Sequence, residues 1–405
     1  MKLIGSILIY AGTAIGAGML ALPLATAHIG FPFSLILFLS WWVVMTFTAF
    51  MLLEVNLCFQ EGASFSSMSV GTLGRTWQTI TWFCFLLLLY SLIAGYVAEG
   101  GNLLQTTTLN FFKIDIPSWG STFIYTSVLA VFVFFGKAKV DYINRLFMSL
   151  QIVIFFIVFF MLIKYIDISN LVGSKQHLPF IMPAVPVIMV CFGSHFVIPS
   201  LRGYLNSDEK KLKIVILIGS LIPLFIYICW ETVSLGVLPL SGDNSFQHIF
   251  SEKGSVAEMM SVMKNIIESP TINYYTNIFM HMALATSFLG ASLSLFDFVM
   301  DGFSLDFRNW SNRILVTITI YAIPVVFALY YPKGFILALR YASIFGAILV
   351  ILLPSFMVLK LQKTERFRNS FYTKWHNFII YLSITSGLAV ILIAILINLN
   401  LMIER

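Results

Sequence analysis

Long apolar stretches separated by short polar segments run along almost the whole chain. A membrane-spanning helix needs about 20 predominantly apolar residues, and by that rule the pattern predicts eleven spans. Their expected ranges are 3–28, 31–57, 78–106, 119–136, 146–164, 181–203, 213–238, 274–301, 313–330, 334–358 and 377–399. The first stretch is too long for the apolar part of a signal peptide, so we expect it to be retained as a helix.

Composition supports the same fold class, an all-α polytopic membrane protein. Only 10% of the 405 residues are charged and 59% are hydrophobic, whereas soluble domains carry about 25% charged residues. The net charge of +6 comes from short basic clusters between spans, which is the pattern of the positive-inside rule and not of nucleic-acid binding. The placement of lysine and arginine predicts a cytoplasmic N-terminus and a periplasmic C-terminus.

The loop of residues 239–272 falls on the outer side in this topology. Ser255 and Glu258 form a capping box, which marks the start of a helix. The apolar residues that follow are Met259, Met260, Met263, Ile266 and Ile267. Their spacing predicts a short amphipathic helix, either on the membrane surface or over the mouth of the protein.

Two spans carry residues that break helices near the middle. The first reads YAGTAIGAGMLALPLA and the sixth reads VPVIMVCFGSHFVIPSLRG. In each, a mid-span glycine is followed five or six residues later by a proline, Gly18 to Pro23 and Gly193 to Pro199. As the first and sixth of eleven, these spans occupy matching places in two blocks of five, and matching interruptions indicate the binding site of a transporter.

An interrupted helix exposes backbone groups that are costly at membrane depth unless they line a cavity or meet a ligand. Free N–H groups attract an anion and free carbonyl groups attract a cation, so a zwitterionic amino acid suits such a break. The alternative is close helix packing, because Gly12 and Gly16 have the GxxxG spacing. The matching break in the sixth span favours a site.

Several segments resemble the bacterial aromatic (hydroxy/aromatic) amino acid permease family, and its tyrosine-transporting members most of all. They are AGTAIGAGMLALPLA, GSLIPLFIYICWETVSLG, LATSFLGASLSLFDF and FALYYPKGF. The resemblance extends from the first span through the tenth. It implies the leucine-transporter type of fold, an inverted repeat of five plus five helices, with proton-coupled import. The repeats would occupy 1–170 and 171–360, and 361–405 would hold a cytoplasmic loop and a peripheral eleventh helix.

The resemblance also implies a substrate site around the two breaks. The backbone of the first break would bind the substrate carboxylate and ammonium groups, at Ala14, Ile15, Gly16, Ala17 and Gly18. The opposite wall would consist of Phe192, Gly193, Ser194 and His195. Spans three and eight would complete the pocket with Tyr90, Ala94, Ser287 and Gly290.

Ionisable groups inside spans are costly, by roughly 2.5–3.5 kcal/mol for a charge at the centre, and are functional candidates. Glu99 and Glu231 are candidates for proton coupling, with the alternative that they line an outer vestibule or join helices. His195 lies in the second break, and its unperturbed pKa of about 6.5 suits a proton carrier or a partner for a tyrosine hydroxyl group. The candidates for gates are Glu54, Asp297, Asp301 and Arg340.

The coupling ion stays open on the residues. Some proton-coupled relatives in the wider superfamily have a lysine in the middle of span five, but this span has Gln151 in its inner half and Lys164 only at its outer end. Thr286 and Ser287 offer hydroxyl groups like those that hold sodium in sodium-coupled members.

We therefore expect a secondary active importer of aromatic amino acids, tyrosine in particular, driven by proton symport across the bacterial inner membrane. The alternatives are a sodium-coupled or broader neutral amino acid transporter, and an amino acid sensor that does not transport. We find no motif of an enzyme and expect no cofactor, no metal and no need for an oligomer. Four cysteines, Cys58, Cys84, Cys191 and Cys229, lie in or beside apolar spans without paired spacing, which predicts reduced packing residues.

Overall fold

The structure is a computed structural model that describes residues 2–172, 178–251, 254–362 and 376–399. Within these ranges the chain forms helices and no strand. Ten helices are long and apolar enough to span a membrane, and eleven spans result when the bent pair α1 (Lys2–Ala14) and α2 (Gly18–Thr26) is counted as one. The all-α fold class and the eleven expected spans are confirmed for the described residues.

The other spans follow the predicted ranges closely. They are α3 (Phe31–Leu57), α5 (Arg75–Thr107), α6 (Ser118–Phe135), α7 (Lys137–Leu162), α9 (Ile181–Cys191) with α10 (Ile198–Tyr204), α11 (Glu209–Val237), α14 (Pro270–Gly302), α15 (Trp310–Tyr330), α16 (Phe335–Gly346) with α17 (Leu353–Leu361), and α19 (His376–Asn398). The largest difference is in α7, which starts at Lys137 and not near residue 146. Its first turns are polar, so hydropathy alone does not detect them.

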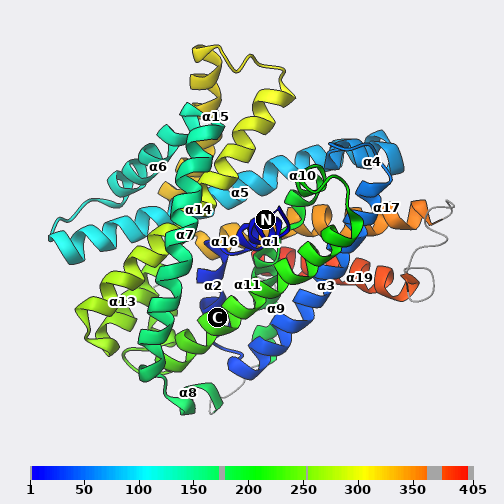
Figure 1. Cartoon of the computed structure of the whole chain (residues 1–405). Coiled ribbons are helices and arrows are strands. Elements are labelled where there is room, and N and C mark those ends of the chain that lie inside the picture. Colours follow the sequence, from blue (N-terminus) through cyan, green and yellow to red (C-terminus); the bar gives the residue numbers. More distant parts are fainter. Residues whose placement is uncertain (1, 173–177, 252–253, 363–375, 400–405) are drawn as a thin grey trace.

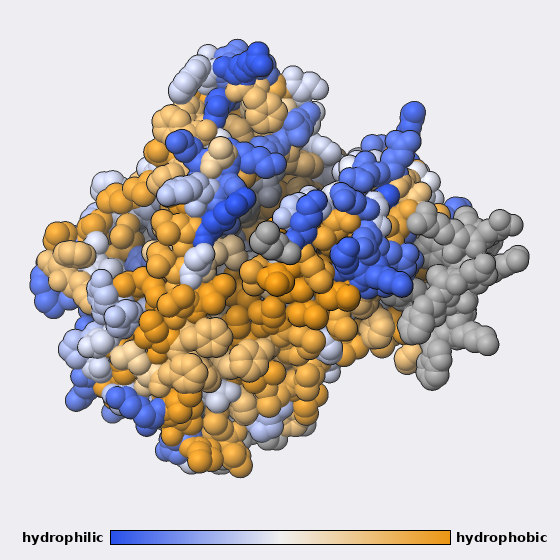
Figure 2. All heavy atoms as spheres, in the orientation of Figure 1, coloured by the Kyte–Doolittle hydropathy of each residue, from blue (hydrophilic) through white to orange (hydrophobic). Residues whose placement is uncertain are grey.

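Shorter helices mark the two ends of the bundle. α4 (Phe65–Leu73) and α10 lie toward one end, and α8 (Ile168–Val172) and α13 (Val256–Ile267) lie toward the other (Figure 1). We refer to these as the α4 end and the α13 end. Figure 2 shows a broad apolar band across the middle of one face, with hydrophilic side chains at its margins, as expected for a surface in contact with lipid.

The predicted amphipathic helix is α13. Ser255 caps it by accepting a hydrogen bond from the N–H group of Glu258 at 3.0 Å, so the capping interaction is confirmed. Its apolar side chains, Met259 and Met263 among them, are buried in the protein. The helix packs against α5, α14 and α2. It therefore covers the end of the bundle, which decides between the two positions that the sequence left open.

Both predicted interruptions are present. α1 and α2 are bent by 49° relative to each other across the break of residues 15–17. In the sixth span, α9 ends at Cys191, and helical structure resumes with a short 3-10 turn at His195–Val197 before α10. The two breaks lie inside the bundle, where α2 packs against α9 and α1 packs against α11.

Candidate functional site

The two breaks meet at one hydroxyl group. Tyr227 on α11 is buried, and its hydroxyl oxygen lies 2.7 Å from the carbonyl oxygen of Ala14 and 2.7 Å from that of Cys191. These carbonyl groups belong to the last residues of α1 and α9, so two half-helix C-terminal ends converge here. The C-terminal end of a helix carries a partial negative charge, and the convergence makes this point attractive to a cation.

The N-terminal end of α2 lies beside it and is contacted by span eight. The backbone N–H group of Ala17 donates a hydrogen bond to the hydroxyl oxygen of Ser287 on α14 at 2.7 Å. A β-carbon added at Gly16 would overlap the same oxygen. Ser287 therefore acts as a hydrogen-bond acceptor at the N-terminal end of α2, the position where a helix favours negative charge.

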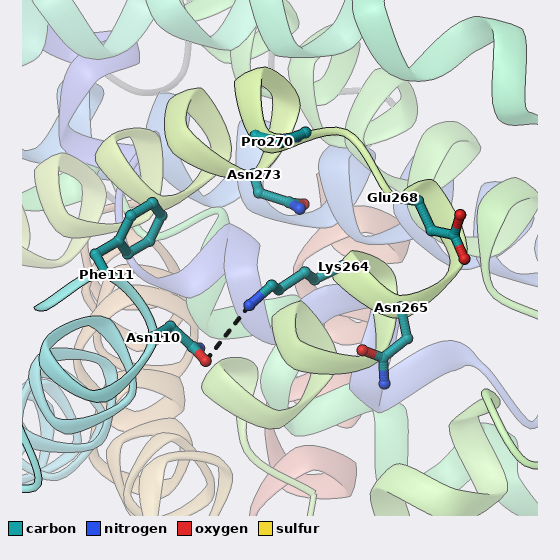
Figure 3. Close-up of a pocket in the computed structure, with 7 residues that line it drawn as sticks. All are labelled: Asn110, Phe111, Lys264, Asn265, Glu268, Pro270 and Asn273. Atoms are coloured by element: carbon teal, nitrogen blue, oxygen red, sulfur yellow. Dashed lines mark hydrogen bonds between the residues drawn. The ribbon is translucent and has the colours of Figure 1, made fainter. Parts of the chain in front are cut away.

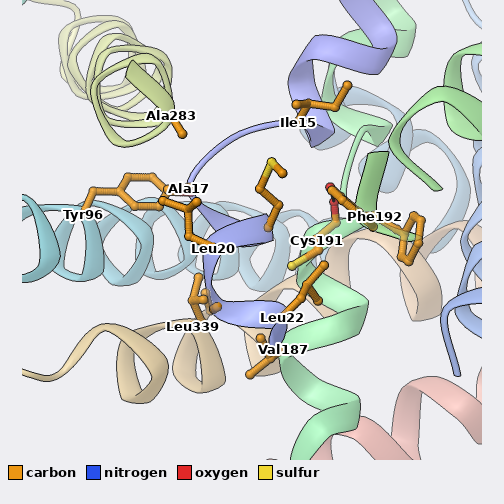
Figure 4. Packing of buried hydrophobic residues seen from close by; sticks show 14 of the residues in the cluster. Ile15, Ala17, Leu20, Leu22, Tyr96, Val187, Cys191, Phe192, Ala283 and Leu339 are labelled. Atoms are coloured by element: carbon orange, nitrogen blue, oxygen red, sulfur yellow. Dashed lines mark hydrogen bonds between the residues drawn. The ribbon is translucent and has the colours of Figure 1, made fainter. Parts of the chain in front are cut away.

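Span three contributes Tyr96 to this region. Figure 4 shows the Tyr96 ring beside Ala17, with Phe192 and Cys191 on the other side of α2. Phe192 also contacts Tyr227 edge to face, with ring centroids 5.1 Å apart. The breaks are thus enclosed by aromatic side chains from α5, α11 and the sixth span.

The structure does not bring Tyr90 to the breaks. Its hydroxyl group donates to the carbonyl oxygen of Thr319 on α15, at 3.3 Å. Ala94 lies one turn further along α5 on the same helix face. Hydropathy selects the span but not its rotation, and the residue of α5 that lies beside Ala17 is Tyr96. The place of Ala94 in the pocket stays a prediction.

On span eight, Ser287 and Gly290 behave differently. Ser287 contacts the first break, as described above, whereas Gly290 is exposed and has open space where a side chain would be. Ser294, one turn beyond Gly290, is also exposed and donates to the Gly290 carbonyl oxygen. Toward the α4 end, α14 therefore presents a small, polar face that nothing in the described part of the chain covers.

His195 packs behind the second break. It is fully buried, and its Nε2 atom lies 2.9 Å from the hydroxyl oxygen of Thr48 on α3. Its Nδ1 atom is buried without a hydrogen-bond partner among the described residues. The imidazole ring thus links the second break to span two.

Glu99 on α5 is fully buried at the N-terminus of α13. Its Oε1 atom accepts a hydrogen bond from the backbone N–H group of Ala257 at 2.8 Å. The other carboxyl oxygen, Oε2, is buried with no hydrogen-bond partner in the described ranges. A second contact holds the same helix, because Lys333 and Glu258 form an ion pair at 3.7 Å. Glu99 thus joins span three to the helix that covers the α13 end.

Glu231 on α11 is also fully buried. It accepts a hydrogen bond from the hydroxyl group of Thr26, at the end of α2. Its Oε2 atom has no hydrogen-bond partner within the described part of the chain. Glu99 and Glu231 therefore share one property: each uses one carboxyl oxygen to hold another element and keeps the second oxygen unpaired.

The hydroxyl groups of Thr286 and Ser287 are directed at different partners. Thr286 donates to the Oε1 atom of Gln151 on α7 at 3.3 Å, while Ser287 accepts from Ala17. Gln151 is buried, and its Nε2 atom has no hydrogen-bond partner in the regions that the structure describes. The inner-half glutamine of span five thus contacts span eight directly.

Two gate candidates have defined surroundings. Glu54 on α3 pairs with Lys213 on α11 at 3.1 Å, and Lys213 also pairs with Glu209 at 2.7 Å. This ion pair joins two spans at the α4 end. Arg340 on α16 is buried, with only 8% of its surface exposed.

Asp297 and Asp301 line a cavity of about 450 Å³ at the α4 end, together with Lys137 and Arg313. A second cavity, of about 600 Å³, lies at the α13 end. Figure 3 shows Lys264 from α13 reaching across it to Asn110, with 3.5 Å between the Nζ and Oδ1 atoms. The two cavities flank the breaks along the direction of the spans.

Within the described ranges, no group of three or more His, Cys, Asp or Glu side chains is arranged to hold a metal ion. All four cysteines are free thiols. The arrangement at the breaks instead offers backbone groups and hydroxyl groups, which bind charged groups of a small molecule without covalent chemistry.

Sequence reasoning missed Tyr227, Tyr96 and Arg202. A signal was present for Tyr227, because a tyrosine inside an apolar span needs a hydrogen-bond partner for its hydroxyl group. Arg202 is buried on α10, where it donates to the backbone carbonyl of Asn56 and, at 3.0 Å, to Ser207. A buried arginine near a predicted loop carries no such signal before the fold is known.

Comparison with known proteins identifies relatives of the whole chain. Residues 1–394 match the tryptophan/tyrosine permease family. The chain is 34% identical to tyrosine-specific transport system 1 of Haemophilus influenzae, over 90% of this chain and 89% of that protein. It is 31% identical to the tryptophan-specific transport protein of the same organism, over 96% and 94%. The low affinity tryptophan permease of Escherichia coli strain K12 is 29% identical, over 95% and 93%.

Proposed function

Because the chain belongs to the tryptophan/tyrosine permease family, we propose that it imports tyrosine by proton symport across the bacterial inner membrane. It is a multi-pass membrane transport protein and not an enzyme. The proposed orientation places the N-terminus and the α4 end in the cytoplasm and the C-terminus and the α13 end in the periplasm. Its support is the distribution of lysine and arginine along the loops.

One observation carries the proposal: both charges of an amino acid have a matching half-helix end at the breaks. The C-terminal ends of α1 and α9 converge at Tyr227 and suit the ammonium group. The N-terminal end of α2 at Ala17 suits the carboxylate group. We place the substrate between them, with Gly16, Gly193 and Ser287 around its charged part and Tyr96 and Phe192 near its ring.

The same arrangement supports the five-plus-five repeat, with residues 1–170 and 171–360 as its halves. The broken spans are the first and the sixth, and each ends its first half-helix at a carbonyl group that contacts Tyr227. In this scheme α19 lies outside the repeats, as the peripheral eleventh helix.

For the proton, we favour Glu99 as the carrier. Its Oε1 atom accepts from α13 while Oε2 is buried and unpaired, and a neutral carboxyl group is far less costly to bury than a carboxylate. Protonation would weaken the bond to Ala257 and loosen α13 from the bundle. Proton binding would then be coupled to opening of the periplasmic end. Glu231 and His195, which are also buried with one unpaired polar atom, are the next candidates.

Sodium coupling is the alternative, through Thr286 and Ser287. Their hydroxyl groups already form hydrogen bonds with Gln151 and Ala17. A sodium ion would have to compete with these partners, which favours the proton as the coupling ion. Tryptophan is the alternative substrate, since several relatives are named as tryptophan transporters.

The deciding experiment is uptake of labelled tyrosine into proteoliposomes under an imposed proton gradient or an imposed sodium gradient. The proposal expects accumulation with the proton gradient alone. One charge moved through 100 mV supplies about 2.3 kcal/mol, enough for roughly fifty-fold accumulation. A requirement for sodium would overturn the coupling ion, and competition by tryptophan stronger than by unlabelled tyrosine would overturn the substrate.

A further inference from the structure

The cavity at the α4 end carries balanced charges that its own residues leave unsatisfied. Lys137 and Arg313 line it together with Asp297 and Asp301. Among the described residues, neither aspartate forms an ion pair within 4.0 Å, although two cations face the same space. Charged groups that line one cavity without pairing with each other are available to a ligand.

The charge balance narrows the class of ligand. A simple anion would be attracted by Lys137 and Arg313 but repelled by the two aspartates. A simple cation would be attracted by the aspartates but repelled by Lys137 and Arg313. A zwitterion places one charge toward each pair, so both electrostatic interactions are favourable. An α-amino acid carries its two charges close together, as a cavity of about 450 Å³ requires.

The guanidinium group of Arg313 is held in position at the edge of this cavity. Its guanidinium group donates to the carbonyl oxygen of Phe134 and lies over the Phe134 ring, 5.4 Å from the centroid. Its Nε atom is buried and has no hydrogen-bond partner among the described residues. Gly136 forms the adjoining turn with φ +95°, and a β-carbon there would lie 3.2 Å from the Nη2 atom of Arg313. The turn thus lets the guanidinium group approach the backbone closely.

The rest of the lining is aromatic. Phe296 is buried on α14, and Phe307 is partly exposed in the segment that leads to α15. Pockets for small ligands measure about 300–1,000 Å³ and combine apolar walls with a few polar groups, and this cavity has both properties. Aromatic walls favour an aromatic side chain over a polar one.

We propose that this cavity is a second binding site, for a free aromatic α-amino acid on the cytoplasmic side. The carboxylate group contacts Lys137 and Arg313, and the ammonium group contacts Asp297 and Asp301. The inference rests on the proposed function for the class of substrate and for the side of the membrane. Amino acid that accumulates in the cytoplasm fills the site, which lies at one end of α14, the helix that contacts the first break through Ser287.

The cavity at the α13 end provides a control of similar chemistry. It has one cation, Lys264, which already contacts Asn110, and one carboxylate, Glu268 (Figure 3). This cavity thus has one charge of each sign, and its cation already has a partner. The substitutions Lys264→Gln and Glu268→Gln remove the same kinds of group without touching the proposed site.

The test is equilibrium binding of labelled tyrosine to the purified full-length protein in lipid nanodiscs. Two sites per chain are expected for the wild type and for the control pair Lys264→Gln/Glu268→Gln. The pair Lys137→Gln/Asp301→Asn should bind one, because losing a charged hydrogen bond weakens a site at least about tenfold. Both residues are exposed, so these changes are compatible with folding. Gly16→Ala, which blocks the breaks, should also leave one site.

Three results would overturn the inference. A single wild-type site that Lys137→Gln/Asp301→Asn leaves unchanged would remove the second site and leave the proposed function standing. Displacement of labelled tyrosine from the second site by inorganic phosphate as effectively as by unlabelled tyrosine would assign the cavity to an anion. Absence of any tyrosine binding to the wild type would refute the proposed function, and the inference with it.

Discussion

The hydroxyl group of Tyr227 lies 2.7 Å from the carbonyl oxygen of Ala14, the last residue of α1 before its break. The same hydroxyl group reaches Cys191 at the end of α9 at an equal distance. One side chain from the seventh span therefore connects the two interrupted helices. Any movement that separates the breaks must lengthen at least one of these hydrogen bonds, which makes Tyr227 a direct probe of the site.

Tyr227→Phe should reduce the initial rate of tyrosine uptake at least about tenfold. The substitution removes the single O–H donor that the two buried carbonyl groups share, which costs about 1–3 kcal/mol of folding stability, and it loosens the geometry of the site. Rates in proteoliposomes and thermal unfolding of the purified variant measure the two effects. The matched control is Tyr330→Phe, because Tyr330 is 79% exposed. Unchanged uptake by Tyr227→Phe would show that the bridge has no part in transport.

Gly16→Ala should abolish uptake while membrane insertion stays intact, and Gly16→Leu should do the same. A β-carbon at this position overlaps Ser287, so the first break cannot keep its contact with α14. Gly5→Ala on the same span is the control, since its β-carbon would lie 3.9 Å from the nearest atom, the hydroxyl oxygen of Tyr204. Gly193→Leu tests the second break in the same way. Transport retained in both break variants would refute the site.

Glu99→Gln should uncouple transport from the proton. The glutamine side chain is neutral, like the protonated carboxyl group, and cannot exchange a proton, so its bond to Ala257 should stay weak and α13 should no longer respond to the proton gradient. Accumulation driven by a proton gradient should fall from roughly fifty-fold per 100 mV to none, while exchange of labelled for unlabelled tyrosine continues. Glu258→Gln, at a partly exposed position on the same helix, should preserve accumulation. Full accumulation by Glu99→Gln would direct the search to Glu231 and His195.

The ion pair between Glu54 and Lys213 should contribute little to folding stability. Lys213 is 36% exposed at its side chain and shares its charge with Glu209, and such pairs contribute about 0.2–1 kcal/mol. A double-mutant cycle with Glu54→Gln and Lys213→Gln, followed by thermal unfolding, measures this coupling. If Glu54 acts as a gate, the single variants should change uptake far more than they change stability. Equal, small effects on both would make it a packing residue.

Much of the fold could be predicted because its signals are local. A spanning helix is recognised by its own apolar residues, so the ranges of α3, α11 and α14 match the structure within a few residues. The breaks follow from glycine and proline in the same short stretches. The capping box at Ser255 predicts the start of α13 from four consecutive residues. None of these inferences needs the position of another helix.

The substrate site could be predicted only in part, because rotation of a helix about its axis depends on its neighbours. Tyr90 of span three contacts α15, while Tyr96 of the same span lies beside Ala17. The apolar residues of a membrane helix surround it on all sides, since lipid and protein interior are equally apolar. The hydropathy pattern therefore contains no marker of the face that points inward.

The sequence by itself determined the membrane class, the succession of spans and the two interruptions, because length, hydropathy and backbone-breaking residues act within a single helix. The tertiary structure decided which groups meet. It brought Tyr227 to Ala14 and Cys191, Ser287 to Ala17, and Glu99 to the start of α13. These partners are between 36 and 270 residues apart in the chain. Their contacts follow from how the helices pack, which no local pattern encodes.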